Sequence, residues 1–194
     1  MRLTTLVSAL LLGLTSALQG AVTFSIQEIG SDVVFTGSGT IDLEGLGAPA
    51  SAGWSGSVSP SNAWAIVGAG GDADVYTVSV FPTNIGSGGT TFADANTGDL
   101  FGVFKSHLYV PQDYISGSSL LGTSTFSGQS LASLGLTEGV YTWSWGSGGN
   151  ADSATLTISA VPEPGTWALA AGIVSLGFVG LKRYRKVRGA VSKA

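Results

Sequence analysis

Apolar and polar residues alternate along several short stretches of the chain. Val22, Phe24 and Ile26 occupy every second position, with polar residues between them, and this period of two predicts a strand with one buried face. A turn sequence at residues 30–32 leads into a second apolar run at residues 33–35, so the two runs together predict a hairpin. Further strands are predicted at residues 63–67, 76–81, 100–104, 108–110, 140–145 and 154–158.

Glycine-rich segments separate these predicted strands. The chain contains 30 glycines among 194 residues, about twice the usual share of ~7%, and many of them gather at residues 68–71, 86–89 and 146–150. Such segments favour tight turns. No helical period competes within residues 21–160, and we therefore expect this region to be a mainly β domain.

One short sequence predicts how the strands are connected. Residues 136–141 read Leu-Thr-Glu-Gly-Val-Tyr and resemble the L-x-P-G-x-Y sequence of a tyrosine corner, with Glu138 where proline is usual. In such corners the Tyr hydroxyl bonds to the backbone a few residues upstream and fixes a connection of a Greek-key sandwich. We therefore expect residues 21–160 to form an antiparallel β-sandwich with Greek-key-like connections. Tyr141, Trp143 and Trp145 share one strand face; we expect this face to belong to the core, with a platform on which sugars stack as the alternative.

The N-terminus has a different pattern. Arg2 precedes a short apolar segment at residues 6–14, and small residues follow at 15–17. A positive start, a short apolar stretch and small residues are the pattern of a secretory signal peptide, which we assign to residues 1–20. Cleavage after Ala17 fits the small-x-small rule best, and a site near Gly20 or Ala21 is the alternative.

A second apolar segment lies near the C-terminus, at residues 166–181. Its run from Trp167 to Leu181 spans about 22 Å as a helix, less than the ~30 Å hydrocarbon core. Bilayer thinning and snorkelling of the basic residues that follow can close the difference. We therefore predict a single transmembrane helix, with a buried amphipathic helix as the alternative. The anchor residues are Trp167, Leu169, Ile173, Val174, Leu176, Phe178 and Leu181, and the basic stop is formed by Lys182, Arg183, Arg185, Lys186 and Arg188.

A short motif precedes this helix: Val161, Pro162, Glu163 and Pro164. Motif, helix and basic residues, at 161–188, together resemble a PEP-CTERM sorting signal, which occurs on exported proteins of Gram-negative bacteria that make extracellular polysaccharide. Residues 189–194 complete the tail. The resemblance implies that the precursor is anchored in the inner membrane with its basic tail in the cytoplasm. It also implies that signal peptidase and exosortase process the chain, which then reaches the cell surface or extracellular matrix.

Residues 108–117 and 145–153 are also similar to an ectodomain found just before such signals. That similarity implies no biochemical activity. It places the predicted β domain outside the inner membrane and leaves its task open.

Charge is distributed unevenly along the chain. Of the 8 Lys and Arg residues only Lys105 lies within residues 21–160, and of the 12 acidic residues only Glu163 lies outside them. A domain with eleven acids and one base is not expected to bind nucleic acid, because phosphate contacts need basic patches. Solubility, or cation-mediated contact with an anionic matrix, fits this charge better. The absence of cysteine excludes disulfides and thiol chemistry.

Two kinds of binding site are conceivable from the sequence. Asp72, Asp74 and Asp152 offer oxygen ligands for calcium on loops, although Asx-turn capping explains such aspartates as well. Trp54 and Trp64 lie in Gly- and Ser-rich surroundings, and we expect them to be exposed rings on which a sugar could stack.

Residues for catalysis are scarce. His107 is the only histidine, and we expect it to be a surface or loop residue. Asp72 and Asp74 are close in sequence, and Asp94 and Asp99 lie in the next loop region; both pairs are in turn-like segments where Asp is common. No catalytic residue is predicted. The sequence favours a non-enzymatic surface or matrix protein associated with exopolysaccharide. A carbohydrate-binding module is the alternative, and a polysaccharide-acting enzyme is the least favoured interpretation.

Overall fold

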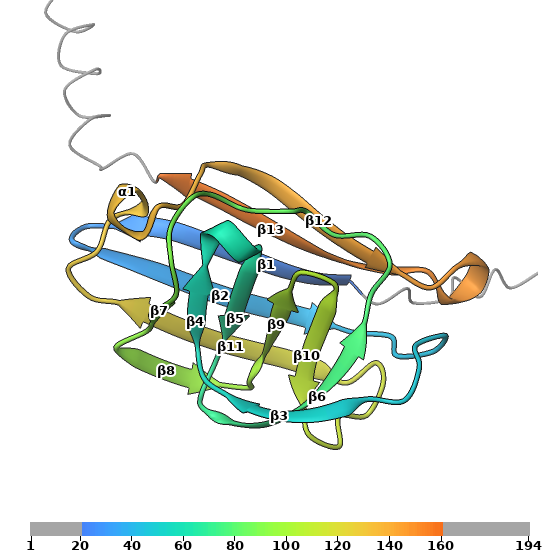
Figure 1. Ribbon diagram of the computed structural model, residues 1–194. Helices are drawn as coiled ribbons and strands as arrows, with labels where there is room; N and C mark the ends of the chain where they lie inside the picture. The colour runs from blue at the N-terminus through green and yellow to red at the C-terminus, as the bar shows by residue number, and fades with distance from the viewer. Residues whose placement is uncertain (1–20, 161–194) are drawn as a thin grey trace, which may run out of the picture.

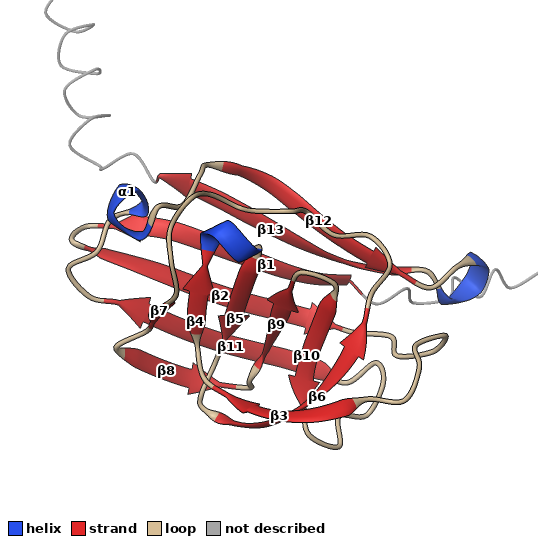
Figure 2. Ribbon diagram, in the orientation of Figure 1, coloured by secondary structure: helices blue, strands red, loops and turns tan. Residues whose placement is uncertain are grey.

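Two β-sheets face each other across one hydrophobic core (Figure 1) in the computed structural model, which describes residues 21–160. Helical segments are short (Figure 2), so the predicted mainly β fold is confirmed. They are α1 (Leu131–Leu134) and the 3-10 turns η1 (Pro60–Asn62) and η2 (Gly148–Asn150).

The first sheet has the strand order β12-β13-β1-β2-β11-β8 and the second has the order β3-β6-β10-β9-β5-β4-β7. The strands of the first sheet are β1 (Ala21–Ile29), β2 (Asp32–Thr40), β8 (Ala95–Gly98), β11 (Ser119–Phe126), β12 (Gly139–Trp145) and β13 (Asp152–Ala160). Those of the second are β3 (Ala50–Trp54), β4 (Ser57–Ser59), β5 (Trp64–Val67), β6 (Gly71–Thr77), β7 (Thr91–Phe92), β9 (Phe101–Phe104) and β10 (His107–Pro111).

The first sheet contains the predicted hairpin and one departure from the predicted pairing. β1 and β2 pair antiparallel up to Ile29 opposite Asp32. β1 also pairs with β13, however, and these two strands are parallel. The expectation of a wholly antiparallel sandwich is therefore wrong at this pair. β1 and β13 come from opposite ends of the domain and need no tight turn between them, which removes the constraint that makes neighbouring strands antiparallel.

The strand predicted at residues 76–81 is displaced. β6 runs from Gly71 to Thr77, and beyond it only Val80 makes an isolated bridge. Within β6, Ala73 and Val75 are buried, while the residues that alternate with them, Asp72, Asp74 and Tyr76, are not. Because aspartate is common in turns, the sequence around the two aspartates of this strand predicted a turn, although its apolar residues follow the period of two of a strand.

β11 was not predicted, because its inward positions are not all apolar. The inward row reads Leu120, Gly122, Ser124 and Phe126, so a glycine and a serine lie between the two large apolar residues. A Cβ at Gly122 would lie 2.7 Å from the carbonyl oxygen of Asp99, so the approach of a neighbouring segment leaves room only for glycine. An inward row with a glycine and a serine has little hydrophobic periodicity to detect.

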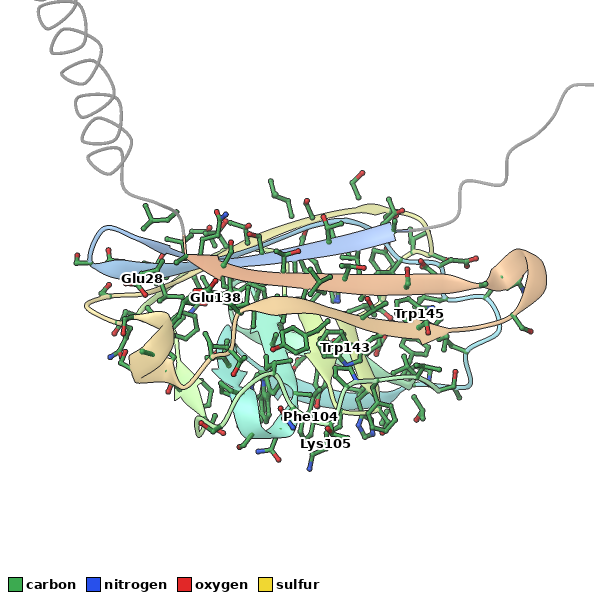
Figure 3. All side chains as sticks on the ribbon, turned by 90° about the horizontal axis from the view of Figure 1, so that it is seen from above. Glu28, Phe104, Lys105, Glu138, Trp143 and Trp145 are labelled. Carbon is green, nitrogen blue, oxygen red and sulfur yellow. The ribbon has the colours of Figure 1, made fainter. Side chains whose placement is uncertain are left out.

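Trp143 and Trp145 are core residues, as predicted. They are 0% and 2% exposed, and both lie on β12 (Figure 3). Each indole N–H donates to a backbone carbonyl, from Trp143 to Lys105 at 3.1 Å and from Trp145 to Asp42 at 3.0 Å. The polar atom of each ring is therefore satisfied inside the core.

Two tyrosine hydroxyls hold loops in place through hydrogen bonds to backbone groups. The hydroxyl of Tyr141 donates to the carbonyl of Thr137 at 2.9 Å, which confirms the bond expected of a tyrosine corner. The hydroxyl of Tyr114 donates to the carbonyl of Ser118 and also accepts the backbone N–H of Ile41 at 3.0 Å. Tyr114 thus joins two segments far apart in sequence, whereas Tyr141 closes a local turn.

We expect Tyr114→Phe to destabilise the domain more than Tyr141→Phe. Tyr141→Phe removes one exposed hydrogen bond, which costs about 1 kcal/mol of stability. Tyr114→Phe leaves the N–H of fully buried Ile41 unpaired, which costs about 1–3 kcal/mol. Urea unfolding followed by tryptophan fluorescence measures both. A larger loss for Tyr141→Phe would contradict this ranking.

Candidate functional site

The second sheet curls over itself at its β3 edge. β3 pairs with β6 and is separated from β5 in the strand order by three strands. Nevertheless the ring centres of Trp54, at the end of β3, and Trp64, on β5, are only 4.5 Å apart. Figure 1 shows β3 running across the ends of β5, β9 and β10. The face of the second sheet that points away from the first sheet is therefore partly enclosed.

A second hydrophobic cluster fills the inside of this curl. Its residues are Trp64, Ile66, Ala73, Val75, Leu100 and Tyr109, with Ala52, Trp54 and Phe104 packed against them. The expectation that both tryptophans are exposed rings is wrong, because Trp64 is only 9% exposed and Trp54 is half-buried. Curling of the sheet buries a surface that a flat sheet would leave in water.

A groove of about 270 Å³ opens beside this cluster. It lies between β3 on one side and β6, β9 and β10 on the other, and we call it the curl groove. Its walls are formed by Ala48, Ala50, Ser51, Ala52, Val75, Thr77, Phe104, His107 and Tyr109. The side chains on the β3 side are small and leave room for the groove, and larger side chains from the facing strands line it.

Strand register explains why these side chains meet. Trp64 lies opposite Phe104, Phe104 opposite His107, and His107 opposite Thr77. Directly paired residues of antiparallel strands project to the same face. A continuous row from β5 to β6 therefore points into the curl.

The rings in this row pack against one another across the strands, tilted for Trp64 and Phe104 and stacked for Phe104 and His107. Ring centres are 4.7 Å apart for Trp64 and Phe104 and 6.0 Å apart for Phe104 and His107. The expected surface or loop position of His107 is wrong, because it lies in β10 and is partly buried. Tyr109, the next inward residue of β10, is 8% exposed, and burial raises the pKa of its phenol. The phenol therefore stays neutral and able to donate.

Two nitrogen atoms in this row are buried without a hydrogen-bond partner, Nε1 of Trp64 and Nδ1 of His107. The other tryptophans among the described residues differ, since Trp54 donates to Ser57 and the two core tryptophans donate to carbonyls. A buried donor left unpaired costs about 1–3 kcal/mol. Inside the curl the fold thus tolerates two buried nitrogen atoms that have no hydrogen-bond partner within the described residues.

A tightly held turn places the only Lys or Arg of residues 21–160 beside the Phe104 ring. Lys105 and Ser106 form the two-residue loop between Phe104 and His107, and Lys105 has a φ of 46°, in the region that favours glycine. Its N–H donates to the carbonyl of Ala63, and its carbonyl accepts from Trp143. The ammonium nitrogen lies 5.6 Å from the centre of the Phe104 ring, and Figure 3 shows both residues on the side away from the first sheet.

No protein-family model matches this chain, and neither the curated proteins nor the solved structures contain a significant match. The curl groove must therefore be interpreted from its own geometry.

The domain's carboxylates mostly fasten loops. Several accept a hydrogen bond from a backbone N–H distant in sequence, which differs from the local Asx-turn capping considered above as the alternative to calcium binding. The pairs are Glu28 with Leu131, Asp74 with Asp113, Asp94 with Ser127 and Asp99 with Leu121. Carboxylates engaged in this way hold loops against neighbouring segments.

Asp152 is the most deeply placed of these carboxylates, at 6% exposed. Its oxygens accept from the N–H groups of Asp42 at 2.7 Å and Ser153 at 2.6 Å. Burial raises the pKa of Asp152, the two N–H bonds lower it, and the nearby charge of Asp42 raises it again; the net shift is upward. Asp152 joins the start of β13 to the segment after β2.

The three aspartates proposed as calcium ligands do not form one site. Asp72 and Asp74 lie on β6 of the second sheet and not on a loop, whereas Asp152 begins the last strand of the first sheet. Between residues 21 and 160, no group of three or more His, Asp or Glu side chains is arranged to hold a metal ion. Calcium binding stays a prediction from the sequence around each aspartate.

The predicted sorting and membrane residues, at 161–188, lie outside the described residues, as does the predicted signal peptide at 1–20. Within residues 21–160 no helix is long and apolar enough to cross a membrane. The resemblance of the C-terminus to a sorting signal stays a prediction.

Sequence reasoning missed Phe104, His107 and Tyr109 as residues of one groove. One signal could have found the first two. A two-residue hairpin loop at 105–106 places the flanking aromatic residues opposite each other and on one face. The contribution of β3 could not be found in this way, because the curl brings together strands that are not neighbours.

Proposed function

We propose that this protein is exported and held at the cell surface or in the extracellular matrix, where its β domain associates with exopolysaccharide without catalysing a reaction. The signal-peptide pattern at the N-terminus and the PEP-CTERM resemblance at 161–188 support export through the inner membrane and processing by signal peptidase and exosortase. Residues 21–160 contain a hydrophobic core shared by two sheets, which supports their assignment as the cargo domain.

The observation that carries the association with polysaccharide is the curl groove. Rings from β5, β9 and β10 line one face of a partly enclosed sheet, and aromatic faces pack against the apolar C–H faces of sugars. This favours a carbohydrate-binding module over a purely structural role. Hydrolysis is not part of the proposal, because the carboxylates described above are engaged with backbone groups.

Retention on the producer's own purified polysaccharide tests this function. In affinity electrophoresis we expect the protein from producing cells to be retarded, and we expect Trp54→Ala to weaken binding about tenfold by removing a ring that covers Trp64. Val140→Ala, at an exposed position on β12 of the other sheet, is the matched control and is expected to bind normally. Retardation no greater than that of an inert acidic protein would refute the association.

A further inference from the structure

The row of aromatic rings inside the curl ends on a ring with one uncovered side. Beyond Trp64 the row continues through Trp54 to Phe92 on β7, and the ring centres of Trp54 and Phe92 are 5.9 Å apart. Phe92 is 53% exposed. Phe104, in contrast, already packs against a ring on each of two neighbouring strands. The free ring surface of the row is therefore at Phe92.

Phe92 is supported from behind by a fixed set of contacts. β7 pairs with β4, where Phe92 lies opposite Ser57. The indole N–H of Trp54 donates to the hydroxyl of Ser57 at 2.9 Å, and that hydroxyl donates to the carbonyl of Ser55 at 3.0 Å. Trp54 also packs on Trp64, with 4.5 Å between the ring centres. Because these contacts order the support in advance, a ligand on Phe92 would pay little for ordering it.

The position of β7 leaves room for a long ligand. This strand is the last of the second sheet on the side opposite β3, so none of the described strands pairs beyond it. Single exposed apolar side chains are normal on a protein surface, but Phe92 is the outer end of a packed row of rings. An extended polymer can lie across this ring without displacing a strand.

Charge at this edge favours a neutral ligand. Lys105 is the only Lys or Arg within residues 21–160, and its ammonium group lies over Phe104, three rings along the row from Phe92. The charged residue closest to Phe92 in sequence is Asp94. A sugar that carries a carboxylate would therefore approach an acid and not a base, whereas a neutral sugar needs only its C–H face to pack on the ring.

We propose that Phe92 is the ring on which a neutral sugar unit of the exopolysaccharide stacks, with the C–H face of a pyranose against the exposed side of Phe92 and Trp54 behind it. The inference rests on the proposed association with exopolysaccharide and names the contact residue and the class of sugar. One ring gives a weak contact with each sugar unit. Such a contact suits a polymer that offers many identical units to many copies of the protein.

Affinity electrophoresis of the mature protein from producing cells, in gels that contain the producer's purified polysaccharide, tests this assignment. Phe92→Leu keeps an apolar side chain and removes the ring, so we expect it to weaken binding about tenfold. We expect Phe92→Trp to bind at least as tightly as the unmodified protein. Because Phe92 is on an edge strand and exposed, both variants are expected to keep the Tm of the unmodified protein.

Phe81→Ala is the matched control for a general effect of exposed rings. Phe81 is 40% exposed and, with Phe92, is one of the two exposed aromatic residues within 21–160. It follows Val80, which bridges to Ser144 of the first sheet. We expect Phe81→Ala to bind the polysaccharide normally.

Two further measurements report on the contact itself. Trp54 touches Phe92, so we expect the polysaccharide to change the tryptophan emission of the unmodified protein and to change that of Trp54→Phe much less. Stacking on a neutral sugar is not screened by ions, so we expect co-sedimentation with the polysaccharide to persist at high salt.

Four results would overturn the assignment: unmodified affinity in Phe92→Leu, an equal loss of affinity in Phe81→Ala, an undiminished emission change in Trp54→Phe, or release of the protein at high salt. If any of them came with retention of the unmodified protein at low salt, only the assignment of Phe92 and its sugar would fail. Failure of the unmodified protein to be retained at all would remove the proposed function as well.

Discussion

Trp143→Ala is expected to lower the free energy of unfolding by about 3–5 kcal/mol, against a total of about 5–15 kcal/mol for a typical domain. The side chain is 0% exposed and is among the largest of the fully buried side chains. Its removal leaves a cavity between the sheets and frees the carbonyl of Lys105, which the indole N–H holds at 3.1 Å. Urea unfolding followed by circular dichroism measures the loss.

Trp143→Phe is the matched control for this change. It keeps an aromatic ring in the core and removes the bond to the Lys105 carbonyl, so we expect a loss of about 1–2 kcal/mol. A near-wild-type stability for Trp143→Ala would show that the first sheet packs without this ring. In that case the role assigned to β12 in the core would be wrong.

Simultaneous replacement of Pro162, Glu163 and Pro164 by alanine is expected to leave full-length protein in the inner membrane. The resemblance to a PEP-CTERM signal implies that exosortase recognises these residues, and a signal without them would not be processed. Cell fractionation combined with intact-mass measurement of the recovered protein checks the outcome. The same measurement on the unmodified protein locates both cleavage positions and detects any attached group.

The control for this sorting experiment is the stability and polysaccharide binding of the β domain in the same variant. The three residues lie outside residues 21–160, so we expect the variant to unfold at the same temperature and to bind polysaccharide as the unmodified domain does. Normal appearance of a shortened protein at the cell surface would contradict the assigned role of the motif. Loss of folding in this variant would instead show that the motif is part of the domain.

Strands with a strict alternation were predictable. The hairpin of β1 and β2, together with β12 and β13, follows a period of two in which apolar residues face the core. The tyrosine corner was also readable, since its bond lies within five residues of sequence. In these segments the local pattern and the final packing agree.

The parts that failed depend on contacts between distant segments. Trp64 is buried because Trp54 of β3 folds over it, and no local pattern around either residue encodes that approach. Gly122 is required by the backbone of Asp99, which hides the strand character of β11. The curl groove could not be predicted for the same reason, because β3 faces β9 and β10 across it and neither of them is its neighbour in the sheet.

The position of β13 has a mechanical consequence. This strand lies between β12 and β1 and is paired with both along its length, up to Ala160 opposite Glu28. Tension applied along the strand from its carboxyl end therefore loads two rows of hydrogen bonds at once, in shear, and does not open them one after another. A domain pulled from that end while a polymer is gripped in the opposite sheet would resist extension, as a load-bearing link between a cell and its surrounding gel must.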